Sequence, residues 1–284
     1  MVCKWRVVLC FLNMVFKIIF RVFLDCFSSM EYNKPIQWKA GAAMTPSRPY
    51  VPSTISPVVL GEKNRDPYDG LRPWSAITHG LGSLLAVIGT VLLLFHSIDL
   101  KLDLWHIIGF TVYGTSMICL YTASTLYHSL NISVAGRLAL RKYDHCSIAL
   151  LIAGSYTPIC LTALREQGAW GWTILGIIWA MAIASCCLSL FWINAPRWLS
   201  AGVYLIMGWL ALAALLPLSR SLPFIGMFWL LLGGVFYTIG GVLYAIKWPG
   251  RGNPRFGCHE IFHLFILAGS VCHFLLMYQA ISYL

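Results

Sequence analysis

Two histidines stand four residues apart at the start of the last long apolar segment, in the string His259-Glu260-Ile261-Phe262-His263. On a helix of 3.6 residues per turn, this spacing places both imidazoles on one face. Neutral imidazole is a common metal ligand, and HExxH in a soluble protein indicates the zinc helix of a metalloprotease. Here the surrounding segment is apolar enough to cross a membrane, so the metal site predicted by this motif must be positioned by transmembrane helices.

The composition is that of a polytopic helical membrane protein. Apolar residues make up 59% of the 284 residues, charged residues only 11%, and the mean hydropathy is +0.75. These values lie outside the range of ordinary globular domains. The net charge of +10 does not indicate nucleic-acid binding, because the basic residues lie between the apolar segments. The ten cysteines form no CxxC pair and fall mostly inside apolar segments, so we expect neither a disulfide framework nor a thiolate metal site.

Seven apolar stretches predict an all-α bundle of seven transmembrane helices, since a span needs about 20 mostly apolar residues. Their ranges are 74–98, 104–130, 143–164, 169–192, 198–218, 224–246 and 257–283. Short links with Asp, Asn, Arg, Pro or Gly separate them, as turns do. We therefore expect one seven-helix domain over residues 66–284, preceded by an N-terminal extension over residues 1–65.

The charge pattern of the N-terminal extension predicts that its first part lies at the membrane surface. Its first 26 residues are apolar but interrupted by charges, and the longest charge-free run is too short to span a bilayer. At 100° per residue Arg6, Lys17 and Arg21 fall on one face, which favours an amphipathic helix on an anionic surface. A signal peptide and a true start at Met30 are the alternatives. Residues 27–73 are rich in Pro, Ser and charge and predict an irregular cytoplasmic tail.

The distribution of positive charge predicts the orientation. Among the links on one side, only Lys101, Arg165 and Arg220 are basic, whereas the other seventeen of the 20 Lys and Arg residues lie on the opposite side. Cytoplasmic loops carry the excess of Lys and Arg. The N-terminus is therefore expected in the cytoplasm and the C-terminus outside.

With this orientation, three predicted helix ends carry polar side chains at one depth. The second span ends with Ser124 and His128, the third begins near Asp144, and the seventh begins with His259 and His263. Ionisable groups inside a membrane cost at least ~2.5 kcal/mol each unless they are paired or hydrated. We expect these side chains to converge into one site on the cytoplasmic side.

One assignment uses all five residues. His128, His259 and His263 would supply three nitrogens to Zn²⁺, and three protein ligands with an open fourth position are the pattern of a catalytic zinc. Asp144 would orient a water molecule or take its proton. Ser124, on the same helix face as His128, would bind a ligand or donate to a developing oxyanion.

The remaining polar residues of these segments have other expected roles. Glu260 lies about 100° around the helix from His259, so we expect it to face the lipid headgroups and not to be the base. His79 is expected to pack between helices or to support a metal ligand. His273 is expected to make an interhelical hydrogen bond.

The residues resemble the hemolysin III family. The resemblance rests on Ser124-Thr125-Leu126-Tyr127-His128, on the segment from Lys142-Tyr143-Asp144-His145 through Pro158, and on His259 through His273, and it covers residues 66–284. That family belongs with the adiponectin and progestin receptors and is more distantly similar to alkaline ceramidases. The resemblance implies a seven-helix bundle with zinc in the cytoplasmic leaflet, held by His128, His259 and His263, with Asp144 as the acid holding water and Ser124 as the family's serine.

Three functions follow as alternatives. The first is a zinc-dependent hydrolase of a lipid amide or ester, because the predicted open metal site lies within reach of acyl chains. The second is a receptor-like sensor or membrane-homeostasis protein in which zinc is structural. The third is cytolysis, which the family's name suggests but which no soluble form or charged lumen in the sequence supports. In each case the expected partners are membrane lipids, and the expected location is a bacterial cytoplasmic membrane.

Overall fold

Helices account for all the regular secondary structure in the described part of the chain. The computed structural model describes residues 71–250, 253 and 256–284, and the predictions for the N-terminal extension lie outside this range. The elements are α2 (Pro73–Asp99), α3 (Leu104–Ser129), α4 (Val134–Leu161), α5 (Trp170–Phe191), α6 (Arg197–Trp209), the 3₁₀ helix η1 (Leu210–Ala214), α7 (Leu215–Ser221), α8 (Phe224–Ile246), α9 (Cys258–Gln279) and the 3₁₀ helix η2 (Ile281–Tyr283). The all-α prediction is confirmed.

In the part of the chain that the structure describes, six helical stretches are long and apolar enough to cross a membrane. They are α2, α3, α5, the stretch Arg197–Ser221 that joins α6 to α7, α8, and Cys258–Tyr283. Large apolar side chains point outward from several of them; Leu84, Ile183 and Ile206 are each more than half exposed. Such extended apolar surface suits contact with lipid and would be unfavourable in water. The chain is an integral, multi-pass membrane protein.

Helix α4 departs from the predicted third span. The helix begins at Val134, nine residues before the predicted start at residue 143, because the Ser133 side chain caps it by accepting a hydrogen bond from the Gly136 N–H at 3.2 Å. Its first half carries Arg137, Arg141, Lys142 and Asp144, so it is not among the six apolar stretches. The predicted fifth span is also interrupted, since η1 separates α6 from α7.

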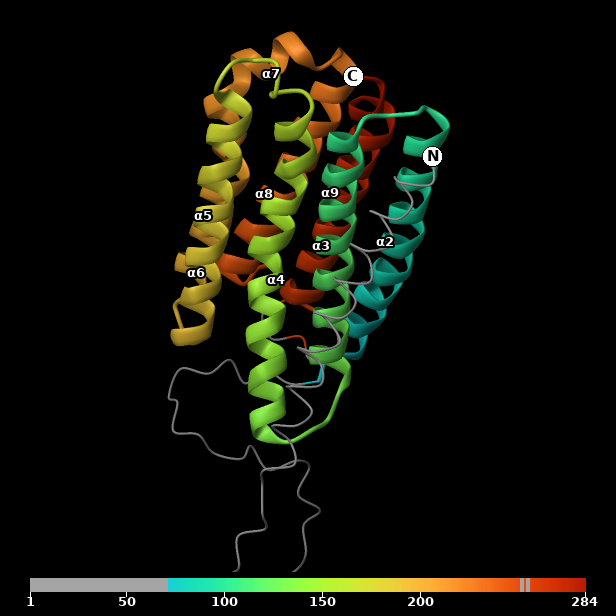
Figure 1. Ribbon diagram of the computed structural model, residues 1–284. Helices are drawn as coiled ribbons and strands as arrows, with labels where there is room; N and C mark the ends of the chain where they lie inside the picture. The colour runs from blue at the N-terminus through green and yellow to red at the C-terminus, as the bar shows by residue number, and fades with distance from the viewer. Residues whose placement is uncertain (1–70, 251–252, 254–255) are drawn as a thin grey trace, which may run out of the picture.

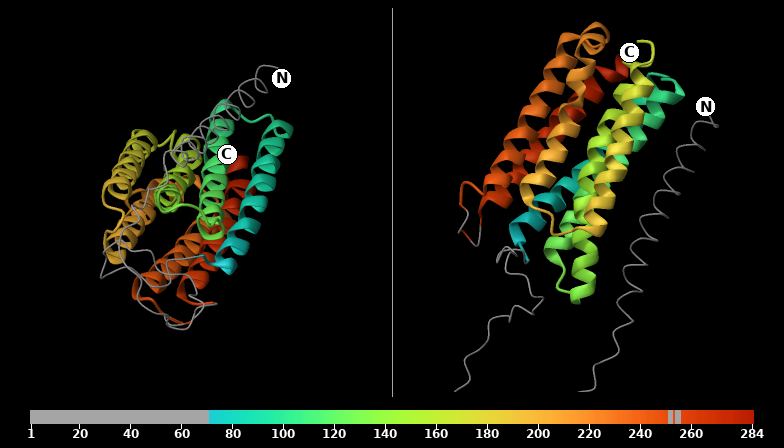
Figure 2. Two further views of the ribbon diagram at one scale, coloured as in Figure 1. Left: turned by 90° about the horizontal axis from the view of Figure 1, so that it is seen from below. Right: turned by 90° about the vertical axis from the view of Figure 1, so that its left-hand side faces the viewer.

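The long helices lie side by side in one bundle (Figures 1 and 2). Helix α3 packs between α2 and α4, α4 contacts α5, and α8 packs between α6 and α9. Contacts of α9 with α2 and of α6 with α4 complete the arrangement. The described links therefore alternate between two ends of the bundle, as the sequence predicts for successive spans.

Small residues allow α3 to approach its neighbours closely. A Cβ atom added to Gly109 would lie 2.7 Å from the Cα atom of Pro158 on α4. A Cβ atom added to Gly114 would lie 2.3 Å from Oγ1 of Thr90 on α2. Close backbone approach through small residues is how helices associate in membranes. This packing fixes the position of the C-terminal end of α3, where His128 lies.

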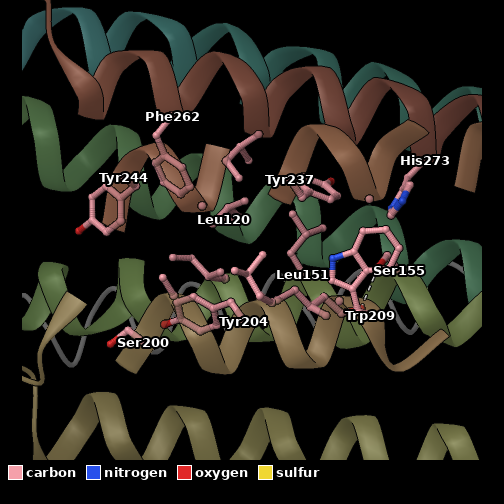
Figure 3. A pocket seen from close by; sticks show the side chains of 18 of the residues that line it. Leu120, Leu151, Ser155, Ser200, Tyr204, Trp209, Tyr237, Tyr244, Phe262 and His273 are labelled. Carbon is pink, nitrogen blue, oxygen red and sulfur yellow. Dashed lines mark hydrogen bonds between the residues drawn. The ribbon is translucent and has the colours of Figure 1, made fainter. Parts of the chain in front are cut away.

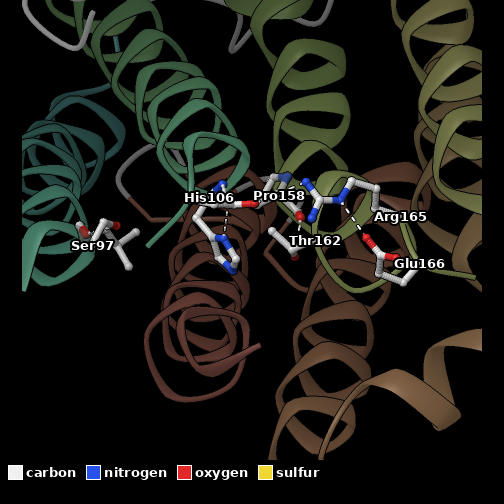
Figure 4. Close-up of polar contacts among 8 residues, drawn as sticks. Ser97, His106, Pro158, Thr162, Arg165 and Glu166 are labelled. Atoms are coloured by element: carbon white, nitrogen blue, oxygen red, sulfur yellow. Dashed lines mark hydrogen bonds and ion pairs between the residues drawn. The ribbon is translucent and has the colours of Figure 1, made fainter. Parts of the chain in front are cut away.

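Polar contacts join two links at the end of the bundle where α3 begins (Figure 4). The Asp103 carboxylate accepts a hydrogen bond from the His106 N–H at 3.1 Å and contacts Nδ1 of the same residue at 2.6 Å. Arg165 Nη1, beyond α4, donates to Asp103 at 3.2 Å, and Arg165 Nε donates to Glu166. Partial burial favours a higher pKa for Asp103, but its hydrogen bonds with His106 and the charge of Arg165 outweigh that effect and lower the pKa.

Candidate metal centre

Three histidines meet where α3 ends and α9 begins. His128 lies in the last turn of α3, and His259 and His263 lie in the first two turns of α9. Each offers one ring nitrogen, and these three nitrogens lie within 4.8 Å of one another. His128 and His263 are buried, while His259 is partly exposed. The sequence predicted this convergence from spacing and orientation.

One pair of the three imidazoles lies at the separation expected for two ligands of one metal ion, while the three nitrogens together extend over 4.8 Å. The Nε2 atoms of His128 and His259 are 3.1 Å apart. Two nitrogens bound to one tetrahedral zinc at 2.0–2.1 Å would be about 3.3 Å apart. The Nδ1 atoms of His128 and His263 are buried without a hydrogen-bond partner in the described part of the chain. Imidazole nitrogens suit zinc, copper, iron and nickel, so this set of ligands can hold a divalent metal.

Glu260 fastens the first turn of α9 to α2. Its carboxylate accepts hydrogen bonds from the Gly257 N–H at 2.8 Å, from Arg72 Nη1 at 3.1 Å and from Ser75 Oγ at 3.1 Å. The residue is buried, with 1% of its surface exposed, so the expectation that it faces lipid headgroups is wrong. An acidic residue in the first turn both caps the free N–H groups and complements the helix dipole. Glu260 thereby positions the helix turn that carries His259.

Asp144 and Ser124 line a cavity that also reaches His259 and His263. Ser124 lies one helical turn before His128 on α3 and is buried. Asp144 is half-buried and lies ten residues into α4, not at its start, because the helix begins at Val134. Four of the five predicted site residues therefore line this cavity. The fifth, His128, does not line it but contacts the rings of His259 and His263, which do.

His79 lies directly against the histidine cluster. Its ring stacks on that of His263 with 3.6 Å between centroids and 6° between planes. Tyr121 packs edge-on against His79, with 5.0 Å between the two ring centroids. Both ring nitrogens of His79 are buried without a hydrogen-bond partner in the described residues. The sequence indicated the correct end of the bundle for His79, but not this contact, which depends on how α2 packs against α9.

The cavity that His259 and His263 line is also lined by Leu151 and Trp209 from the middle of α4 and the end of α6. Figure 3 shows part of this lining, from Tyr244 to His273. The volume of the cavity is about 210 Å³, far more than the roughly 10–15 Å³ that one water molecule needs. His273, for which the sequence predicted an interhelical hydrogen bond, also lines this cavity. The ring interacts with the backbone of Leu230 on α8, as that prediction requires, although neither ring nitrogen meets strict hydrogen-bond geometry with any described residue.

The chain is similar to proteins of one family over most of its length. The family model described as haemolysin-III related matches residues 73–274. The hemolysin-3 homolog of Bacillus subtilis is 38% identical over 200 residues, which cover 70% of this chain and 89% of that protein. Hemolysin-3 of Bacillus cereus is 39% identical over 201 residues, covering 70% of this chain and 87% of that protein. The adiponectin receptor protein of Drosophila melanogaster is 30% identical over 216 residues, covering 69% and 48%. The chain therefore belongs to the haemolysin-III-related family.

Proposed function

We propose that this protein is a zinc-dependent hydrolase that cleaves a lipid amide or ester within the membrane. The observation that carries the proposal is the convergence of His128, His259 and His263 at one end of an interior cavity. Three protein ligands are the pattern of a catalytic metal, whereas structural zinc sites close all four positions. A cavity with mostly apolar walls beside such a site suits a lipid substrate better than a soluble one.

The proposal includes a topology with seven spans. Helix α4, the third in chain order, would be the span added to the six apolar stretches. Its charged first half would lie at the membrane surface and its apolar second half in the bilayer. The end of the bundle near the histidines carries Arg72, Arg137, Arg141, Lys142, Arg197 and Lys247. Because positive residues favour the cytoplasmic side, this end would face the cytoplasm, with the C-terminus outside. We place the protein in a bacterial cytoplasmic membrane.

Each side chain around the cavity would have a distinct role. Zinc, held by His128, His259 and His263, would supply Lewis acidity and make a water molecule more acidic. Asp144 would hold the attacking water by a hydrogen bond and accept its proton. Ser124 would donate a hydrogen bond to the substrate carbonyl oxygen as negative charge develops there. The apolar wall would hold the acyl chain and exclude bulk water from the reacting bond.

The test is hydrolysis by the purified full chain in lipid nanodiscs. Substrates would be ceramide-like amides and matched esters, with metal content measured on the same samples. We expect turnover that is lost in Asp144→Asn while zinc remains bound. Stoichiometric zinc with no turnover of any lipid amide or ester would overturn the hydrolase proposal.

A second candidate is a sensor in which zinc is structural. It is favoured by the similarity to the Drosophila protein, whose name describes a receptor. In that case His128→Ala would unfold or destabilise the bundle. Asp144→Ala would leave both the fold and the bound zinc intact, and neither the wild type nor the variant would hydrolyse lipid. The cytolytic alternative takes its support from the name of the Bacillus cereus relative. It would require discrete single-channel currents and lysis by detergent-free protein.

A further inference from the structure

The interior cavity continues far past the histidine cluster. Its lining includes Tyr244 near the cluster and Trp209 and His273 farther along (Figure 3). It also includes Leu215 and Leu218 of α7, which follow Trp209 along the chain. His263 and His273 lie ten residues apart on the uninterrupted helix α9, which corresponds to ~15 Å along the helix axis. That length is half of a typical ~30 Å hydrocarbon core. A ligand with its head at the cluster therefore reaches His273 with a more distant part of its chain.

The walls between the histidine cluster and His273 are mostly apolar. Leu120, Leu151 and Ile266 are among the residues that line this middle section, together with Phe262 nearer the cluster. Such walls hold an acyl chain without offering it a hydrogen bond. A polar group that selects among chains must therefore lie beyond this section, where His273 also lines the cavity.

His273 is held firmly beyond this apolar section, and its one polar contact with the described protein is a weak one to the Leu230 backbone. Only 8% of its surface is exposed, and neither ring nitrogen meets strict hydrogen-bond geometry in the described part of the chain. Gly233 on α8 leaves the space for the ring, since a Cβ atom there would lie 2.4 Å from His273 Cδ2. The Tyr237 ring packs against it edge-on, with 5.2 Å between centroids. Buried polar groups are normally paired, so a weakly paired imidazole lining a cavity indicates a missing partner.

The other polar groups near His273 are already paired within the protein. The Tyr237 hydroxyl shares a hydrogen bond with Ser270 Oγ at 3.0 Å. Trp209 Nε1 donates to Thr238 Oγ1 at 2.9 Å, and Ser155 Oγ donates to a backbone carbonyl at 2.8 Å. A neutral imidazole offers one donor and one acceptor, which matches a hydroxyl group. His273 is therefore the group best placed to recognise a hydroxyl that enters through the cavity.

We infer that the part of the cavity around His273 is a polar subsite, in which His273 hydrogen-bonds a hydroxyl group carried in the middle of an acyl chain. The preferred ligand is then a mid-chain hydroxylated lipid and not a plain saturated one. The inference rests on the proposed function in placing the ligand's polar head at the histidine cluster. It does not require that the ligand be hydrolysed.

Binding without turnover tests this inference separately from the hydrolase proposal. The full chain in nanodiscs would be titrated with octadecanoic acid and with its monohydroxylated forms, each hydroxyl at a different carbon, against a fluorescent fatty acid. We expect a mid-chain hydroxyl to tighten binding about 2–10-fold, the effect of one added hydrogen bond. A hydroxyl beside the carboxylate should give no such gain.

Variants assign the effect to His273. His273→Phe should bind the unsubstituted chain as wild type does and lose the preference for the hydroxyl, whereas His273→Gln should keep part of it. His96→Phe is the matched control, because His96 lies against Tyr278 and does not line the cavity. Equal affinity of the wild type for all the acids, or a preference that survives in His273→Phe, would overturn the inference. If His273→Phe does not fold, the position scan on the wild type still decides, since a gain only near the carboxylate contradicts the subsite.

Discussion

At the scale of single residues, the histidine cluster depends on neighbours that contribute no metal ligand. His79 stacks on His263 and fixes the plane of its ring. Glu260 fixes the first turn of α9, which precedes His263, through three hydrogen bonds. Loss of a group that orients a metal ligand typically weakens metal affinity about 10–100-fold.

Replacing His79 tests this support. His79→Ala removes the ring that stacks on His263 and should weaken metal affinity about 10–100-fold, as expected for the loss of an orienting neighbour. His79→Phe keeps a flat ring in the same place and should retain most of the affinity. Competition with a chromogenic zinc chelator measures both. Equal affinity for His79→Ala and wild type would mean that the stack does not position His263.

Replacing Glu260 tests its role as a helix cap. Glu260→Gln leaves the nearly buried Arg72 guanidinium without its ion pair, so we expect a loss of about 1–3 kcal/mol in unfolding free energy. The folded fraction should still bind metal and, if the hydrolase proposal holds, still turn over substrate. Glu166→Gln is the matched control, since Glu166 forms an exposed ion pair with Arg165 and its loss should be nearly neutral. Full stability with abolished turnover would instead indicate that Glu260 is the catalytic base.

At the scale of helices, the position of His128 depends on the packing of α3 between α2 and α4. The contact of Gly109 with Pro158 is the tightest backbone constraint on that packing, because proline cannot move aside as a flexible side chain can. Overpacking of a close contact typically costs 1–3 kcal/mol.

A glycine comparison measures this constraint. Gly109→Ala should lower the unfolding midpoint, because the new Cβ atom would lie 2.7 Å from the Pro158 backbone. Gly176→Ala on α5 should be neutral or slightly stabilising, because no atom lies within 4 Å of its new Cβ. Thermal unfolding in detergent measures both variants. An equal effect of the two substitutions would contradict the close α3–α4 contact.

Asp103, in the link that precedes α3, should make the protein less stable as the pH falls into the acidic range. The pKa of Asp103 is lower in the folded protein than in the unfolded chain, where it is about 3.9. Its contribution to stability is therefore fully present above the unfolded pKa and is lost as pH falls through the folded pKa. Asp103→Asn should flatten the fall in unfolding midpoint below about pH 4. An unchanged pH profile in Asp103→Asn would show that another group causes the fall.

At the scale of the whole molecule, the sequence predicted the helical class and the convergence of His128, His259 and His263. Periodicity gives the position of a residue around its helix, and the charge distribution gives its depth in the membrane. These two quantities are enough to predict that side chains at helix ends of the same depth come together. They do not determine which side chains meet laterally inside the bundle. The stacking of His79, the burial of Glu260 and the weakly paired ring of His273 all depend on lateral packing. The early start of α4 depended on the Ser133 cap, which the apolar run did not include.

Metal content tests the central claim most directly. The wild-type chain and the variants His128→Ala, His259→Ala and His263→Ala would be purified under identical conditions, with His96→Ala as a control outside the cluster, and zinc would be measured per folded chain. We expect one zinc ion in the wild type and the control, and a loss of most of it in each of the three variants. A wild type that holds no metal, or triad variants that retain it in full, would contradict the metal centre described here.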